Sequence, residues 1–139
     1  MKVEVLRNIN NFKIDFNDLT KITDILPDNV FIKRHRITVK PFDSFEIDNL
    51  RKEIKKQLNL NLLDCDIYAS FSSIYGGTTF HIDEENVFIL NSYGRVCYNI
   101  HEEQVHSNIL EKNDAIIIPG GIAHSVHALT PRISLSFRV

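Results

Sequence analysis

The 139-residue sequence lacks the features that would place it in several common classes. No apolar run approaches the roughly 20 residues of a membrane span. The first residues, MKVEVLRNIN, have no apolar core of the signal-peptide type, so we expect a cytoplasmic protein. The two cysteines, Cys65 and Cys97, are too few for a disulfide framework. No repeat or linker divides the chain, and its length predicts a single domain over residues 1–139.

An excess of charge of one sign is also missing. Sixteen basic residues face eighteen acidic ones, which gives a formal net charge of −2. Nucleic-acid-binding domains are usually basic, so this balance argues against a nucleic-acid partner. Basic residues do gather at 33–36, KRHR, and at 51–56. We interpret the second group as the solvated side of a helix and KRHR as a polar strand face, with an anionic-substrate or RNA contact as the alternative.

Alternation, helical spacing and turn residues predict a mixed N-terminal half and a strand-rich C-terminal half. We expect strands at 1–6, 11–16 and 29–42 and helices at 17–28 and 43–60. Further short strands are expected at 66–74, 78–82, 86–93, 95–100, 115–121, 123–129 and 132–139. Many short strands without helices between them are typical of a barrel or sandwich. The predicted fold is mainly β, with an N-terminal α+β cap over 1–64 and a barrel core over 65–139.

The stretch GGTTFHIDEENVFILNSYGR, residues 76–95, carries the strongest chemical signal. His81 and Asp83 are two residues apart, and residues at this spacing point to the same side of a strand. One imidazole and one carboxylate therefore aim at one point, as two of the three ligands of a facial metal triad. A set of imidazole and carboxylate ligands with open positions suits non-haem Fe(II).

The best third ligand is His124, which follows a buried strand and a tight turn in AIIIPGGIAH. In a barrel, this turn can bring His124 opposite His81. The remaining histidines are expected on the other strand face, in a polar loop over 101–108, or in the basic strand. They are His127, His101, His106 and His35. We predict a metal site of His81, Asp83 and His124.

Two stretches, residues 76–95 and LEKNDAIIIPGGIAHSVHAL at 110–129, resemble the JmjC-like, cupin-type Fe(II)- and 2-oxoglutarate-dependent oxygenases. The likeness is to the branch of ribosomal-protein and asparaginyl hydroxylases, and it covers residues 66–139. It implies a double-stranded β-helix (a cupin or jelly-roll barrel) with Fe(II) at its mouth. It also implies 2-oxoglutarate as co-substrate, O2, and hydroxylation of a C–H bond with release of succinate and CO2. The substrate would be a small molecule, an amino acid or a peptidyl side chain.

The resemblance also suggests residues that contact 2-oxoglutarate. Thr78 matches a position where the family often has a hydroxyl for this contact, and Asn91 matches an inward polar position near the site. Tyrosine and serine side chains could line the mouth. These are Tyr68, Ser70, Ser72, Tyr75, Tyr93 and Tyr98.

The residue that binds the distal carboxylate of 2-oxoglutarate departs from the family pattern. The family usually has Lys or Arg at the position of Val96. Arg95 is one residue early and would face the other way unless a bulge re-aims it. Arg132 and Ser134 resemble the Arg-x-Ser motif of another branch of 2-oxoglutarate oxygenases. Because the arginine fork grips a carboxylate bidentately, we favour Arg132 over Arg95.

Val96 supports one alternative, a cupin-type metalloenzyme that works without 2-oxoglutarate, such as a dioxygenase, an isomerase or a lyase. Another alternative is a non-catalytic barrel that binds a ligand or a partner. Exposed edge strands in so short a barrel would also allow a homodimer.

Overall fold

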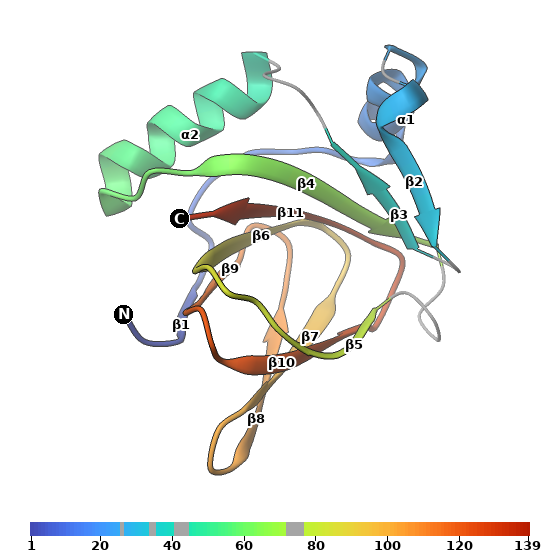
Figure 1. Cartoon of the computed structure of the whole chain (residues 1–139). Helices are drawn as coiled ribbons and strands as arrows, with labels where there is room; N and C mark the ends of the chain where they lie inside the picture. Colours follow the sequence, from blue (N-terminus) through green and yellow to red (C-terminus); the bar gives the residue numbers. More distant parts are fainter. Residues whose placement is uncertain (26, 34–35, 41–44, 72–76) are drawn as a thin grey trace.

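A computed structural model of the chain describes residues 1–25, 27–33, 36–40, 45–71 and 77–139 (Figure 1). In these residues, strands form two antiparallel sheets that pack face to face, and two α-helices cover the outer side of the larger sheet. The helices are α1, Phe16–Ile25, and α2, Phe45–Leu58, with a short 3-10 helix at Pro27–Asn29. Neither α-helix combines the length and apolar character needed to cross a membrane.

The larger sheet has the strand order β1-β9-β6-β11-β4-β3-β2. Its strands are β1 (Glu4–Leu6), β2 (Val30–Lys33), β3 (Arg36–Val39), β4 (Leu63–Ser70), β6 (Val87–Tyr93), β9 (Ala115–Ile118) and β11 (Arg132–Arg138). The smaller sheet has the order β5-β10-β7-β8. Its strands are β5 (Thr78–Ile82), β7 (Val96–His101), β8 (Val105–Leu110) and β10 (Ala123–Ala128).

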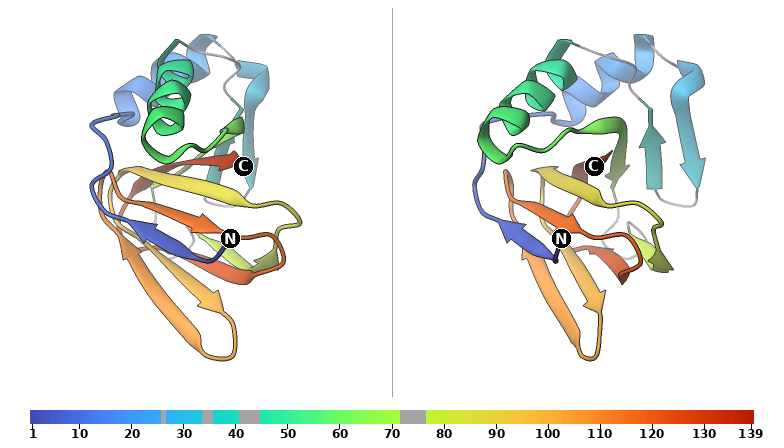
Figure 2. Two further views of the ribbon diagram at one scale, coloured as in Figure 1. Left: turned by 90° about the vertical axis from the view of Figure 1, so that its left-hand side faces the viewer. Right: turned by 60° about the vertical axis from the view of Figure 1, so that its left-hand side comes forward.

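The chain from β4 to β11 passes repeatedly between the two sheets (Figures 1 and 2). In each sheet, a strand from early in this segment lies next to one from late in it, as β4 lies beside β11 and β5 beside β10. This is the topology of a double-stranded β-helix, so the predicted jelly-roll fold is confirmed. The N-terminal strands β1, β2 and β3 extend the larger sheet at its two edges.

Successive side chains of β11 alternate between the helix side of the larger sheet and the interior of the barrel. Ile133, Leu135 and Phe137 are buried in the hydrophobic cluster that contains the apolar face of α2. Arg132 and Ser134 point to the opposite face, toward the barrel interior. The hydrophobic cluster under the helices therefore lies on one side of this strand, and the strand's polar groups face the barrel interior, where a second hydrophobic cluster joins the two sheets.

Three sequence expectations about secondary structure were wrong. Residues 11–16 form no strand, because Asp15 and Asp18 accept hydrogen bonds from each other's backbone N–H and start α1 at Phe16. The expected strand at 29–42 is a hairpin of β2 and β3, with residues 34–35 outside the described part. The expected loop at 101–108 contains most of β8, which pairs with β7.

Candidate metal centre

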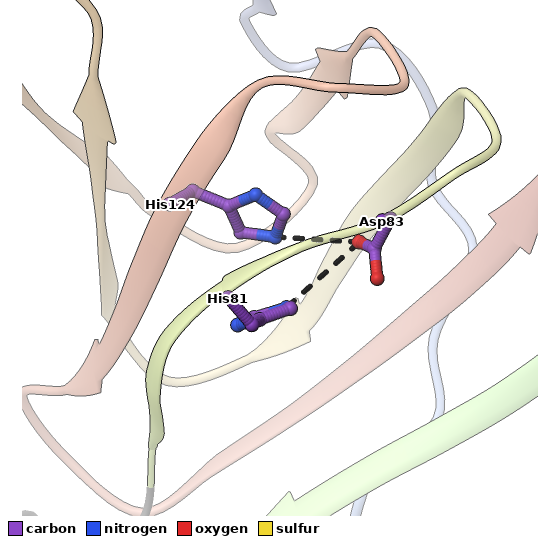
Figure 3. Close-up of side chains that lie close together, drawn as sticks. All are labelled: His81, Asp83 and His124. Atoms are coloured by element: carbon purple, nitrogen blue, oxygen red, sulfur yellow. Dashed lines mark ion pairs between the residues drawn. The ribbon is translucent and has the colours of Figure 1, made fainter.

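The structure brings His81, Asp83 and His124 together, as Figure 3 shows. His81 on β5 and His124 on β10 are directly opposite each other in the antiparallel pair, and their ring centroids are 4.2 Å apart. Asp83 follows the end of β5, and its Oδ2 is 3.4 Å from His124 Nε2 and 3.8 Å from His81 Nε2. One ligand atom from each residue lies within 4.8 Å of the others. The three side chains could therefore hold one metal ion.

Main-chain carbonyls orient both imidazole rings. His81 Nδ1 is 2.8 Å from the carbonyl oxygen of Thr79, and His124 Nδ1 is 3.0 Å from that of Ile122. A carbonyl oxygen only accepts, so Nδ1 of each ring carries a proton and Nε2 is the nitrogen that faces Asp83 and could bind a metal. Burial also lowers the pKa of His124, which favours the neutral ring that a metal requires.

The turn before His124 is bound to the segment that carries Asp83. The Gly121 N–H donates to the Asp83 carbonyl at 2.8 Å, and the Gly120 N–H donates to Asn86 Oδ1 at 2.9 Å. A Cβ on Gly120 would lie 2.3 Å from the carbonyl oxygen of Glu84, so only glycine allows this approach. Sequence reasoning missed the role of Asn86, because its signal is only a polar residue after the His-x-Asp pair.

A cavity of about 850 Å³ lies beside the three ligands. Its wall contains side chains from both sheets. Among them are Tyr68, Thr78, Ile89, Tyr98, Val126, Arg132 and Ser136. The hydroxyl of Thr78 is buried and has no hydrogen-bond partner among the residues that the structure describes. A buried hydroxyl without a partner is costly, so its presence in a cavity wall is typical of a ligand-binding site.

Arg132 is the largest fully buried side chain in the described part of the chain, and it lines the cavity. Its Nη1 donates to Ser134 Oγ at 3.1 Å, and Ser134 Oγ donates to Asn91 Oδ1 at 3.1 Å. Tyr98 lies against the same guanidinium, and burial raises the pKa of Tyr98. Burial also lowers the pKa of Arg132, but arginine stays charged in proteins. A fixed positive charge in a cavity wall favours an anionic ligand group.

The other predicted site residues lie elsewhere. Asn91 and Ser134 are fully buried but do not line the cavity. Arg95 is half exposed and pairs with Glu111 at 2.8 Å, and it does not line the cavity either. No bulge turns Arg95 inward, since β7 starts at Val96 and continues in regular register with both neighbours.

Of the six candidate mouth residues, Tyr68 and Tyr98 line the cavity, and Ser70 and Tyr93 do not. Two more, Ser72 and Tyr75, lie outside the described residues, as do Arg34, His35 and Gly76.

Ion pairs surround the outer part of the cavity. Arg138, at the end of β11, donates to Glu85 at 3.0 Å and also pairs with Asp64. Lys40 lies 3.9 Å from Asp66. All five residues line the cavity, so its outer wall carries both signs of charge, whereas the buried part carries Arg132.

No protein-family model matches the sequence, and no curated protein is similar to it in sequence. Solved structures do match the fold. The ribosomal oxygenase YcfD from Escherichia coli, in complex with cobalt and 2-oxoglutarate, aligns with a TM-score of 0.76 at 20% identity. The alignment covers 99% of this chain and 48% of YcfD, so the chain spans about half the length of that protein.

More distant structures share the barrel. The Drosophila melanogaster CENP-C cupin domain aligns over 79% of this chain and 74% of its own, with a TM-score of 0.58 at 11% identity. Hydroxypropylphosphonic acid epoxidase from S. wedmorenis aligns over 82% of this chain and 57% of its own, with a TM-score of 0.57 at 10% identity. At these identities, the comparisons establish a shared cupin-type fold.

Proposed function

We propose that this chain is an Fe(II)- and 2-oxoglutarate-dependent oxygenase that hydroxylates a C–H bond. One observation carries the proposal: the three candidate metal ligands, His81, Asp83 and His124, line the same cavity as the buried cation Arg132. A metal triad alone would fit many cupins, but a buried arginine in the same cavity suits a co-substrate with a second carboxylate. Structures of the similar YcfD contain cobalt with 2-oxoglutarate or with succinic acid.

The residues present fit the metal and the co-substrate. Two imidazoles with Nε2 free for a metal and one carboxylate make a donor set that suits Fe(II) and leaves positions open. Thr78 lies in the same wall as His81, and a turn of its buried hydroxyl toward the cavity would let it donate to a bound carboxylate. When bound, iron and 2-oxoglutarate would supply the oxidising chemistry, with O2 consumed and succinate and CO2 released.

The protein's own groups would bind and orient. Arg132 would bind the distal carboxylate of 2-oxoglutarate through its planar fork. Tyr98 would help, because its raised pKa keeps the phenol protonated as a hydrogen-bond donor. Asp83 and the two histidines would hold the metal. The main-chain carbonyls of Thr79 and Ile122 would keep the histidine rings aimed at it.

The size of the cavity supports a second molecule beside the co-substrate. Its volume of about 850 Å³ is near the upper end of small-molecule sites, which hold roughly 300–1,000 Å³. The outer wall, with its paired charges, is the part where a small molecule, an amino acid or a peptidyl side chain would enter.

Anaerobic titration of the Fe(II)-loaded protein with 2-oxoglutarate tests the proposal. Chelation of the metal by the keto acid gives a visible metal-to-ligand charge-transfer band, and we expect this band in the wild type and not in His81→Ala. If the wild-type protein binds Fe(II) but develops no band, the proposal is wrong. The buried apolar Val96, at the place where the family has a cation, would then favour a cupin metalloenzyme that works without 2-oxoglutarate.

A further inference from the structure

We propose that Asn91 and Ser134 do not bind the co-substrate but are positioning residues, which hold Arg132 in the orientation that grips its distal carboxylate. The inference rests on the proposed function, and it reassigns two residues that sequence reasoning placed in the co-substrate site. Both side chains are fully buried, and neither lines the cavity, whereas Arg132 does.

The orientation of the Asn91 amide is fixed by its surroundings. Its Nδ2 donates to the carbonyl oxygen of Gly94 at 2.6 Å and lies 3.4 Å from that of Leu110. Two carbonyl oxygens can only accept, so the NH₂ group must face them and the amide oxygen must face the other way. That oxygen, Oδ1, lies 3.1 Å from Ser134 Oγ. Asn91 therefore presents one acceptor to Ser134.

Ser134 has a single hydroxyl proton, and this acceptor takes it. Ser134 and Asn91 are opposite each other on the neighbouring strands β11 and β6, so the contact is built into the register of the sheet. With its proton on the Asn91 side, the Ser134 oxygen offers lone pairs to Arg132 Nη1 at 3.1 Å. A serine bonded in this way has no proton left to donate to a carboxylate.

The chain of donors and acceptors thus runs in one direction, from Arg132 through Ser134 to Asn91. One Nη1 proton is bonded to Ser134, and this bond helps to hold the guanidinium in its orientation. Tyr98 lies against both Arg132 and Ser134 and also lines the cavity. We therefore assign the contacts to the distal carboxylate to Arg132 and Tyr98, with Ser134 and Asn91 supporting the arginine from the sheet.

The test compares two keto acids that differ in the group concerned. 2-Oxoglutarate has the distal carboxylate, and 2-oxobutyrate has the same keto-acid end without it. Calorimetry under anaerobic conditions gives the affinity of the Co(II)-loaded protein for each, without turnover. The ratio of the two affinities measures the contribution of the distal carboxylate, and a general disturbance of the fold or the metal would change both affinities together.

We expect Asn91→Ala to lower this ratio by roughly 3- to 10-fold, the effect of one hydrogen bond, while the affinity for 2-oxobutyrate stays unchanged. Ser134→Ala should lower it by a similar factor. The double variant should lose no more than either single variant, because both break the same chain. Ser92→Ala is the matched control, since Ser92 is a buried serine on β6 that does not line the cavity and whose hydroxyl bonds to the backbone of Ile14; its ratio should equal that of the wild type.

Asn91→Thr keeps a residue that suits a strand but is too short to reach Ser134, so it replaces Asn91→Ala if that variant fails to fold. A wild-type ratio near one would overturn the proposed function and this inference together. A large wild-type ratio that neither Asn91 variant changes would overturn only this inference. Additive losses in the double variant would likewise count against it, because they would mean that Ser134 contacts the carboxylate by itself.

Discussion

The two walls of the cavity support their functional side chains in different ways. On the smaller sheet, His81 and His124 are aimed by main-chain carbonyl oxygens, and the turn before His124 is bound to Asp83 through its backbone. On the larger sheet, Arg132 donates a hydrogen bond to the side chain of Ser134, which donates in turn to Asn91. The proposed metal wall, which is His81, Asp83 and His124, therefore depends on the course of the chain. The proposed anion wall, which is Arg132, depends on the identity of two side chains that do not line the cavity.

Removal of a metal ligand should have the largest effect. His81→Ala or Asp83→Ala should abolish metal binding, a loss beyond the roughly 10–100-fold that removal of a supporting group costs. The fold should survive, because both side chains are partly exposed. Calorimetry with Co(II) and circular dichroism measure the two effects. Metal affinity at the wild-type level in both variants would contradict this assignment of the ligands.

Removing the cation from the anion wall should have the next largest effect. Arg132→Ala should weaken 2-oxoglutarate binding by roughly 30-fold or more, the cost of losing one partner of a buried charged pair. Arg95→Ala should leave binding unchanged, because Arg95 faces outward and pairs with Glu111. Anaerobic titration of the charge-transfer band measures both variants. If Arg95→Ala weakens binding and Arg132→Ala does not, Arg95 and not Arg132 binds the distal carboxylate.

Substitutions in the turn before His124 test how far the stability of this part of the site depends on close backbone packing. Gly120→Ala should cost about 1–3 kcal/mol of stability, because its Cβ would meet the carbonyl oxygen of Glu84 at 2.3 Å. Gly121→Ala should cost about 1 kcal/mol, because a Cβ there meets nothing and only its φ of +85° is unfavourable. Denaturant unfolding measures both, and equal losses would show that the close approach of the two segments is unimportant.

A single hydroxyl should give the smallest effect. Tyr98→Phe should weaken 2-oxoglutarate binding by roughly 3- to 10-fold, as expected for one hydrogen bond, and should leave Co(II) affinity unchanged. Calorimetry with each ligand separates the two. A parallel loss of metal affinity would mean that Tyr98 supports the fold between the sheets and not the co-substrate.

The metal wall was largely predictable from the sequence, because its signals are local. His81 and Asp83 share a strand face through their spacing, and a glycine-rich turn after an apolar strand pointed to His124. The relation between Arg132 and Asn91 was not predictable in this way, because it depends on the pairing of β11 with β6. Only the resemblance to an Arg-x-Ser motif pointed to Arg132, and no sequence pattern indicated that Ser134 and Asn91 lie behind the cavity lining.

In the fold, too, elements with local sequence signals were predicted, and elements that depend on pairing with distant residues were not. The strands of the barrel core were predicted because turn residues separate them. The strand β8 was missed because it is a largely exposed edge strand and its first four residues, 105–108, include a single apolar side chain. Pairing with β7, and not its own pattern, makes this part a strand. Residues 11–16 alternate like a strand, but the hydrogen bonds between Asp15 and Asp18 start a helix there.

The carbonyl oxygens that aim the two histidines have a consequence for the choice of metal. Since the rings are held by the main chain, the protein offers the same two nitrogens and one carboxylate to any divalent ion that arrives. Such donors bind first-row metals in the Irving–Williams order, in which copper, nickel and zinc exceed iron. The cell's supply of metals, and not the shape of the site, would then decide which ion a given molecule carries. Preparations of one sequence from different growth media would accordingly differ in their active fraction.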